Sequence, residues 1–558
     1  MNELKVNLLD FSKKEIFSAL VRWNSSCTSL KGVILDIERL GCEDPELGYM
    51  LPGFIDAHVH IESSMMLPSE FGRMAVRHGT IATVSDPHEI ANVLGIKGVE
   101  FMIANSEKTP FQIFFGAPSC VPATPFETAG STISLSDIDT LFASGKISYL
   151  SEMMNFPGVL SQSKEVVDKL HLAQQYDFPI DGHAPNLLGN DAYLYAQAGI
   201  STDHECTSLK EARDKISAGM KILIREGSAA KDFLTLHPLI SEYPDSVMFC
   251  SDDKHPDELF HSHINKMVID AVALGHSVFD VLACACINPI KHYQLPFGCL
   301  QKGDVMNAVV VDNLTQFNIK TTWLEGEKVA ESGATLLSSV HEDAINYFNA
   351  KPISLDELEI RAKKGKIRVI DLFEGKLFTQ EKIVATDLFK QTPINDNDYQ
   401  IKLEANPKNN ISQLTVLNRY QNAKPANAFV TGTGLQSGAI ASTVAHDSHN
   451  IIAIGCDDIS IQKAINTVIG IKGGICVVNN EGIENLPLPV AGLMSLKKGE
   501  TIAAEYAHLD SLAKSLGFTL TAPFMTLSFL ALLVIPELKL SDMGLFDGRD
   551  FSFKPLNV

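Results

Sequence analysis

Eight short apolar segments follow one another between residues 51 and 253, and each has the composition of a β-strand. They span residues 51–60, 80–86, 111–119, 147–153, 178–184, 200–206, 221–228 and 246–253. Most are separated by helical patterns, such as 163–176, in which apolar residues recur three and four positions apart. Strands that alternate with helices form parallel sheets, and eight such units suit a TIM barrel. We therefore predict an α/β fold built on a TIM-like (β/α)8 barrel over residues 51–299.

The residues on either side of the barrel predict two smaller units. Residues 1–50 and 300–350 have short strand and turn patterns, and we expect them to pair into a small flanking β-sandwich-like domain. Residues 351–558 contain strand patterns, such as 366–372, and late helical patterns, such as 501–517. They predict a C-terminal α+β domain, in agreement with a chain too long for one ordinary domain.

The charge and apolar content of the chain exclude several classes of partner. A net charge of −21 argues against nucleic acid or an anionic membrane surface, because both require clustered Lys and Arg. The longest apolar run, 524–536, is shorter than the ~20 residues of a membrane helix, and we expect a buried helix there. The first residues lack the apolar core of a signal peptide, and the ten Cys include no CxxC pair. We therefore predict a reduced, cytoplasmic protein.

Polar side chains that can do chemistry lie at the downstream ends of the predicted strands. In a TIM barrel all of these ends meet at one face, which is where the active site lies. The candidates are His58, His60, Asp86, His88, Glu89, Glu152, His183, His204, Arg225, Glu226, Asp252 and Asp253. Their common placement is a stronger signal than any single motif.

The pair His58 and His60 predicts a metal site. Residues two apart on a strand share a face, so both imidazoles point into the mouth of the barrel. Two imidazoles on one strand form half of a transition-metal site, and a carboxylate could bridge two ions ~3.5–4 Å apart. The candidate ligands are His58, His60, Glu152, His183, His204 and Asp252. Unrelated barrel histidines are the alternative, but six metal-type residues at strand ends favour the metal site.

A metal ion in this position would supply the nucleophile. It lowers the pKa of bound water from about 15.7 to about 7, which provides hydroxide at neutral pH. Asp252 could bind the metal, hold the hydroxide and accept its proton. This chemistry hydrolyses amides, phosphoesters and C–N bonds of electron-poor rings, and the ligand pattern does not choose among them.

Other motifs for metal or nucleotide chemistry are incomplete. His60 and Glu62 satisfy H-x-E, but the P-C-x-x-C of the zinc deaminases is missing. The H-E pairs at 88–89 and 204–205 do not continue to HExxH, and neither a P-loop nor a nucleophile elbow is present. A second HxH, at 261–263, lies in a helical pattern where residues two apart diverge, so we expect a surface or supporting role.

An ordered set of longer motifs resembles the amidohydrolase superfamily and, within it, the adenine deaminase family. The resemblance runs from about residue 50 to the end of the chain. The motifs are HVHIESSM (58–65), VSDPHEIANVLG (84–95), DGHAP (181–185), DHECTS (203–208), IREGSAAKD (224–232) and CSDDKHP (250–256). The resemblance implies hydrolysis of adenine at C6 to hypoxanthine and ammonia. It also implies two divalent metal ions, manganese or iron as a rule and zinc as an option, with Glu152 as their bridge.

Roles for the other candidates follow as a hypothesis. Asp252 would move protons, and Glu89 would act as the acid at the ring nitrogen with support from His88 and Asp86, because a general acid must lie near the proton it moves. The alternative for DPHE is a structural turn in which the Asp caps a helix. Arg225, Ser228 and Asp253 would contact the purine, as would Asp86; a structural salt bridge is the alternative for Arg225.

Three questions stay open at this point. The chain could instead be a dihydroorotase-like amidohydrolase acting on a cyclic amide, although its fourth strand offers Glu152 and not the Lys common there. It could also be a degenerate, non-catalytic metal-binding relative. The HDSH segment at 446–449 could close an active site, bind extra metal or form a surface loop. As partners we expect adenine and water, and a homo-oligomer with a dimer as the default.

Overall fold

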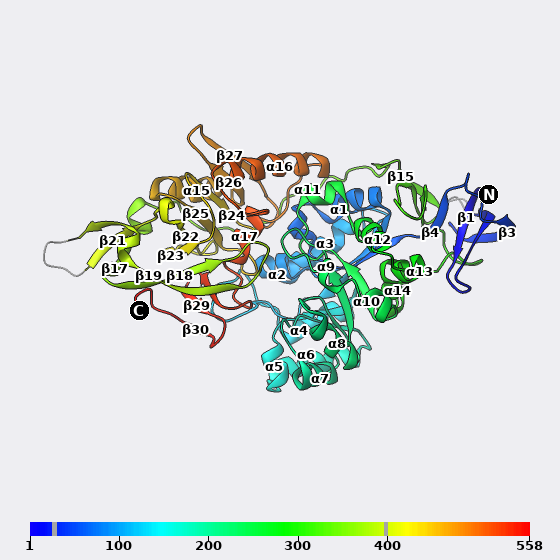
Figure 1. The fold of residues 1–558 in the computed structure, drawn as a ribbon, viewed down its shortest axis with the longest axis horizontal. Coiled ribbons are helices and arrows are strands. Elements are labelled where there is room, and N and C mark those ends of the chain that lie inside the picture. The colour runs from blue at the N-terminus through cyan, green and yellow to red at the C-terminus, as the bar shows by residue number, and fades with distance from the viewer. Residues whose placement is uncertain (25–30, 395–399) are drawn as a thin grey trace.

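The computed structural model describes residues 1–24, 31–394 and 400–558. Eight parallel strands form a barrel, and the helices around it lie between the N-terminal strands and the C-terminal part (Figure 1). The strands are β5 (Phe54–Val59), β6 (Thr80–Ser85), β7 (Gln112–Ala117), β8 (Ile147–Met153), β9 (Ile180–Gly182), β10 (Thr202–Asp203), β11 (Lys221–Arg225) and β12 (Val247–Cys250). Hydrogen bonds join β5 through β9 and β10 through β12 in two parallel ladders. The ring closes where Asp252 N donates to His58 O at 2.9 Å and Ser201 N donates to Ile180 O at 2.8 Å. Each strand lies within one of the eight segments expected from the sequence.

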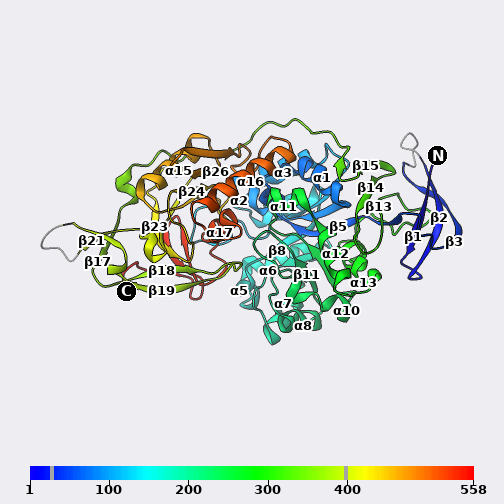
Figure 2. The same cartoon turned by 45° about the horizontal axis from the view of Figure 1, so that its top comes forward.

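Helices follow the barrel strands and cover their outer side (Figure 2). They are α1 (Pro68–Ala75), α2 (His88–Leu94), α3 (Ile96–Ser106), α4 (Leu135–Ala143), α5 (Phe156–Leu160), α6 (Lys164–Gln175), α7 (Gly189–Gln197), α8 (Leu209–Ser217), α9 (Phe233–Leu236), α10 (Leu239–Glu242), α11 (Pro256–His261), α12 (Ile264–Ala273), α13 (Val278–Leu282) and α14 (Asn288–His292). In α6, Val166, Leu170 and Ala173 form the buried stripe. This is the spacing of three and four residues that an amphipathic helix requires.

A continuous eight-stranded sheet flanks the barrel. Its order is β16-β15-β14-β13-β4-β1-β2-β3, so chain segments from both sides of the barrel share it. The strands are β1 (Asn2–Asp10), β2 (Glu15–Trp23), β3 (Ile34–Cys42), β4 (Tyr49–Pro52), β13 (Ala308–Val311), β14 (Ile319–Leu324), β15 (Glu327–Glu331) and β16 (Ala334–Thr335). The Trp23 indole donates to Gly326 O at 3.0 Å and meets Trp323 edge to face. The sheet therefore folds back on itself around a small core.

The C-terminal part is built on a second eight-stranded sheet of order β19-β18-β23-β22-β25-β24-β26-β27. Its strands are β18 (Lys366–Leu372), β19 (Thr379–Ala385), β22 (Ile411–Leu417), β23 (Ala426–Thr431), β24 (Ala439–Ser442), β25 (Ile451–Gly455), β26 (Gly474–Val478) and β27 (Ile483–Pro487). Two three-stranded sheets accompany it, formed by β17 (Ile360–Lys363), β20 (Lys390–Pro393) and β21 (Gln400–Glu404), and by β28 (Leu538–Ser541), β29 (Gly544–Asp547) and β30 (Ser552–Phe553). The helices are α15 (Asp458–Gly470), α16 (Gly499–Ser515) and α17 (Pro523–Phe529).

The buried helix expected over 524–536 is present only in its first half. The helix α17 ends at Phe529, and the prediction of a helix beyond it is wrong. The Leu530 carbonyl accepts a hydrogen bond from Leu540 N at 3.0 Å, so the chain turns back into β28. Pro536 also disfavours a helical conformation at the residue before it.

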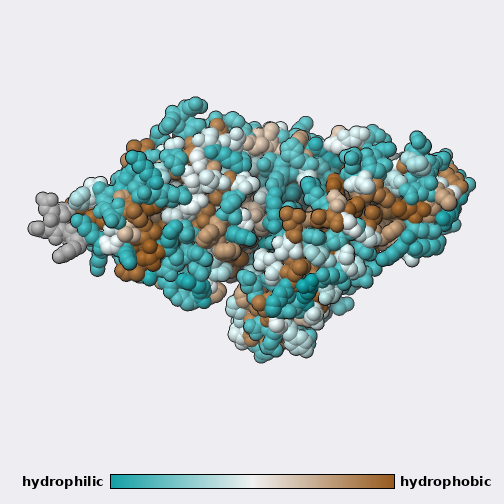
Figure 3. All heavy atoms as spheres, in the orientation of Figure 1, coloured by the Kyte–Doolittle hydropathy of each residue, from teal (hydrophilic) through white to brown (hydrophobic). Residues whose placement is uncertain are grey.

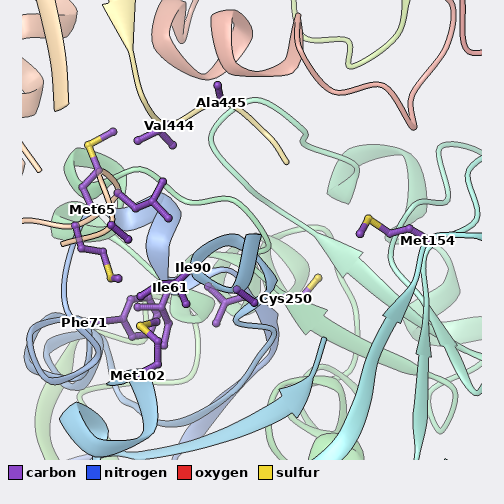
Figure 4. Packing of buried hydrophobic residues seen from close by; sticks show 14 of the residues in the cluster. Ile61, Met65, Phe71, Ile90, Met102, Met154, Cys250, Val444 and Ala445 are labelled. Atoms are coloured by element: carbon purple, nitrogen blue, oxygen red, sulfur yellow. The ribbon is translucent and has the colours of Figure 1, made fainter. Parts of the chain in front are cut away.

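The C-terminal part packs directly on the mouth of the barrel. One hydrophobic cluster contains Met65 and Ile90 of the barrel together with Val444 and Ala445 of the loop after β24 (Figure 4). Ser495 N also donates a hydrogen bond to Met65 O at 2.9 Å. This contact brings the loop of residues 443–450, which connects β24 to β25, to the strand ends that carry the candidate residues.

The face of the molecule in Figure 3 is mostly hydrophilic and is interrupted by smaller hydrophobic patches. Among the described residues, every helix is too short or too polar to span a lipid bilayer.

Candidate active site

The first barrel strand brings three polar side chains to one face. Asp56, His58 and His60 alternate along β5 and its end, and all three are buried. Asp56 lies deepest, where it accepts hydrogen bonds from Ser251 N at 2.9 Å and from His263 Nε2 at 2.8 Å. The His58 ring stacks on His204 with centroids 4.2 Å apart. Asp56 thus ties the first strand to the eighth and fixes the position of the two histidines.

Glu152, at the end of β8, is the centre of the histidine cluster. One carboxylate oxygen lies 2.9 Å from His183 Nδ1 and 3.1 Å from His204 Nε2, and the other lies 3.4 Å from His60 Nε2. Burial raises the pKa of Glu152, but His183 and His204 outweigh it, so the pKa lies well below its usual range. Glu152 is therefore a carboxylate that presents one oxygen to each side of the cluster.

Asp252 follows β12 in a left-handed backbone conformation, with φ of 53°, which Asp tolerates better than most residues. One carboxylate oxygen lies 3.2 Å from His60 Nε2 and 3.7 Å from His58 Nε2. The other accepts a hydrogen bond from Arg225 Nη1 at 2.8 Å. Burial raises the pKa of Asp252, but the His60 contact and Arg225 outweigh it and hold the pKa well below its usual range.

These residues fit a divalent metal. In two groups the ligand atoms lie within 4.8 Å of one another: His58, His204 and Asp252, and Glu152, His183 and His204. Both ring nitrogens of His58 and Nε2 of His183 are buried and have no hydrogen-bond partner. Buried polar atoms of this kind are costly unless a ligand satisfies them. Imidazoles mixed with carboxylates are the donor set that divalent transition metals accept.

The DPHE segment opens α2 beside this cluster. Asp86 accepts from His88 N at 3.0 Å, which caps the turn, and its second oxygen lies 3.0 Å from His88 Nδ1. His88 Nε2 then lies 3.3 Å from Glu89 Oε1. Burial lowers the pKa of His88, but Asp86 and Glu89 outweigh it and raise the pKa well above its usual value. Asp86 thus satisfies the first amide of α2 and orients His88.

Glu89 is enclosed by residues of the C-terminal part. His446 Nδ1 contacts one carboxylate oxygen and His449 Nε2 contacts the other. Burial raises the pKa of Glu89, but His446, His449 and His88 outweigh it, and the pKa lies well below its usual range. Glu89 is therefore ionised, and a proton that it passes to a ligand must reside on a neighbouring group. The HDSH segment accordingly lies in the active site of its own chain.

The three other candidates occupy different positions. Arg225 is fully engaged with carboxylates: Glu205 and Asp252 contact Nη1, and Asp232 lies 3.2 Å from Nη2. Ser228 lies outside the cavity wall, and its hydroxyl accepts a hydrogen bond from His255 N at 2.9 Å. Asp253 faces the cavity.

One cavity at the mouth of the barrel gathers most of the candidate residues, and His58, Asp86, Glu226 and Ser228 are not part of its wall. Its barrel wall consists of His60, His88, Glu89, Glu152, Met154, His183, His204, Glu205, Arg225, Ala230, Asp252 and Asp253. Its C-terminal wall consists of Leu377, His446, Asp447, Phe529, Leu532 and Ile535. Glu205 was not among the site residues predicted from the sequence, although it directly follows His204 at a strand end. Asp447 was missed because nothing local indicates that its loop reaches the barrel.

A TIM-like barrel whose strand ends carry a cluster of four histidines and two carboxylates, five of which line one cavity, is the fold and site of a metal-dependent hydrolase. The amidohydrolase family model matches residues 49–329, and the adenine deaminase C-terminal domain matches residues 383–552. The adenine deaminase of Sulfurovum sp. (strain NBC37-1) is 50% identical over 553 residues, which cover 99% of each chain. The adenine deaminase of Salinibacter ruber is 50% identical over 94% of each chain. That of Methanosarcina mazei is 46% identical over 96% of this chain and 97% of its own. The chain belongs to the adenine deaminase family of the amidohydrolases.

Proposed function

We propose that the protein hydrolyses adenine at C6 to hypoxanthine and ammonia with a divalent metal centre. The observation that carries this proposal is the meeting of five of the six ligand residues with the carboxylate of Glu89 in one cavity, while the sixth, His58, stacks on His204. A hydrolytic deaminase needs both a water-activating centre and a group that controls a proton at the ring nitrogen. The 50% identity to curated adenine deaminases over nearly the whole chain supports adenine as the substrate.

The metal centre would take two divalent ions, manganese or iron, with zinc as an option. The residues that would hold them are His58, His60, His183, His204 and Asp252, with Glu152 placed to serve both ions. The contacts of both Glu152 oxygens with histidines from three strands support this assignment. When bound, such ions make a water nucleophilic at neutral pH.

Two carboxylates move the protons of the reaction. Asp252, fixed by Arg225, accepts the proton of the attacking water and gives it to the departing amino group. Glu89 gives a proton to the ring nitrogen next to C6, so that negative charge does not build up there. His88, oriented by Asp86, stabilises the Glu89 carboxylate. The hydrogens balance, because one hydrogen of the water leaves with ammonia and the other replaces the proton that the enzyme gave to the ring nitrogen.

The remaining candidates orient the purine and the catalytic groups. Asp253 faces the cavity, where it would accept a hydrogen bond from the purine. Arg225 positions Asp252. Ser228 accepts a hydrogen bond from His255 N and so fixes the chain just before α11. The apolar C-terminal wall, which includes Phe529 and Leu532, packs on the ring.

A dihydroorotase-like reaction is the second candidate, and the Glu152 carboxylate at the end of the fourth strand argues against it. Ammonia release from adenine, with adenosine and dihydroorotate in parallel, separates the two. Release from adenine alone supports the proposal, and turnover of dihydroorotate alone refutes it. A Glu89→Gln variant of the metal-loaded protein should lose activity on adenine, and the degenerate, non-catalytic reading predicts that both proteins are inert.

The remaining assignments are also proposals. We propose that the protein is a homodimer, because two-fold dimers are the commonest soluble oligomers. We also propose that it is cytoplasmic. We divide the chain into 1–50 with 300–350, 51–299 and 351–558. The shared sheet of β1–β4 with β13–β16 supports the first unit.

A further inference from the structure

Two histidines of the C-terminal part contact the carboxylate of Glu89. His446 and His449 lie on the loop of residues 443–450, more than 350 residues from Glu89 in sequence. Their relative exposures are 2% and 0%, and that of Glu89 is 1%. Each carboxylate oxygen meets one imidazole, so the pair holds the carboxylate from two directions. We call His446 and His449 the histidine clamp.

The hydrogen bonds around His449 define its tautomer. Ala445 N donates to His449 Nδ1 at 3.2 Å, so Nδ1 carries a lone pair and not a proton. The proton of the neutral ring is therefore on Nε2, where it is donated to Glu89. Burial lowers the pKa of His449, in agreement with a neutral ring. A protonated Nε2 has no lone pair for a metal, so a third metal ion between Glu89, His446 and His449 does not fit this arrangement.

His446 has a different environment. Its Nδ1 contacts Glu89, while its Nε2 is buried without a hydrogen-bond partner and lies 3.7 Å from Asp253 Oδ1. Burial lowers the pKa of His446, but Glu89 and Asp253 outweigh it and raise the pKa to about 9. The ring is therefore an imidazolium at neutral pH, and it is the nearest protonated group that can donate a proton to the ionised Glu89. Phe529 covers one side of the ring, with centroids 5.4 Å apart.

We propose that the histidine clamp positions Glu89 for catalysis, with His449 as a fixed neutral donor and His446 as the holder of the proton that Glu89 passes on. This inference rests on the proposed adenine deamination. As the ring nitrogen gains electron density, the proton moves from His446 Nδ1 to Glu89 and on to the ring nitrogen, which leaves His446 neutral. The water gives one hydrogen to ammonia through Asp252. Its second hydrogen, released when the C6 hydroxyl becomes a carbonyl, restores the proton on His446.

The clamp also gives the C-terminal part a function. The barrel supplies every proposed metal ligand and Glu89, but the two histidines that contact the Glu89 oxygens from the other side come from the loop between β24 and β25. The acid of the site is therefore assembled from two parts of the chain.

Conservative variants distinguish the two histidines. A Gln side chain places its amide nitrogen close to the position of His Nε2, and Asn places it close to Nδ1, but neither amide releases a proton. His449→Gln should therefore keep kcat within about 5-fold of the wild type, whereas His449→Ala should lower it about 10- to 100-fold. His446→Asn and His446→Ala should both lower kcat about 100-fold or more, within the range of general acid catalysis. The KM for adenine should change less than 5-fold in each.

The control is His508→Ala, which removes a histidine of α16 that pairs with Glu484 on the surface at 2.7 Å. It should match the wild type in kcat, KM and melting temperature. If wild-type protein releases no ammonia from adenine, the proposed function fails and the clamp with it. If the wild type is active and the His446 and His449 variants equal the control, only the clamp is refuted.

Metal content provides a readout that does not depend on activity. Elemental analysis should find the same number of ions per chain, two, in the wild type and in all clamp variants. Three ions in the wild type and two in His446→Ala or His449→Ala would show a metal site in place of the clamp. Full rescue by His446→Asn would also overturn the proposal, because it would leave no need for a mobile proton.

Discussion

Replacement of Arg225 by Met is the most informative single change for the role of this residue. The guanidinium is 2% exposed and lies among Glu205, Asp232 and Asp252. Removal of one partner of a buried ion pair costs about 3–5 kcal/mol, because it leaves uncompensated buried charge. A domain of 150–250 residues loses about 2–4 °C of melting temperature per kcal/mol. The Met variant should therefore melt roughly 6–20 °C below the wild type.

The kinetic effect of the same change follows from Asp252. Without the hydrogen bond from Nη1, the Asp252 carboxylate is no longer fixed, and the repulsion among the three carboxylates favours its protonated form. We expect kcat on adenine to fall by at least about 100-fold, while KM changes less than about 5-fold. Arg225→Lys keeps the charge but not the planar fork, and it should be intermediate in both melting temperature and kcat.

Thermal melting and steady-state ammonia release on the metal-loaded variants measure both effects. A KM raised 100-fold in Arg225→Met with an unchanged melting temperature would refute the reasoning. That result would mean that Arg225 contacts the purine and not the carboxylates, which is the role that the sequence predicts.

Three further predictions concern the catalytic carboxylate, the metal and a proton. Asp252→Asn should lower kcat about 10²- to 10⁴-fold, as measured by ammonia release at matched metal content, and an unchanged kcat would exclude Asp252 as a proton carrier. Chelation should abolish activity and lower the melting temperature, because a ligand that binds only the folded state stabilises it; manganese should restore both, and an active metal-free protein would contradict the assignment. The pKa of His446 is raised from 6.5 to about 9 by Glu89 and Asp253 against the effect of burial, so its proton is held at neutral pH and is lost as the pH rises through about 9, while the stability it confers is full below pH 6.5 and declines between 6.5 and about 9. The wild-type pH profile of kcat should fall there, and an identical alkaline limb in His446→Asn would contradict this.

The strand pattern was sufficient to predict the barrel. Each apolar segment is long enough to cross the core, and the polar residue that ends it marks where the strand reaches the mouth, as with His183 after β9. The same reasoning brought Glu152 and Asp252 to one face, because the carboxyl ends of parallel strands must meet there. Local pattern and global fold agree in this part of the chain.

The clamp and the second HxH could not be placed in the same way. The contact of Glu89 with His449 spans 360 residues, and no local periodicity encodes which loop of the C-terminal part covers the barrel. His261 and His263 have a helical pattern, but α11 ends at His261, and His263 turns inward to bind Asp56. The end of a helix is set by tertiary contacts such as this bond, and these are not visible in the spacing of apolar residues.

The central claim is that this site removes the amino group of adenine. The most direct test is ammonia release by protein reloaded with manganese, with adenine, adenosine and dihydroorotate as parallel substrates. We predict release from adenine, formation of hypoxanthine in equal amount, and no turnover of the other two compounds. Protein with two ions bound per chain that leaves adenine intact would contradict the account, whatever the structure of its metal site.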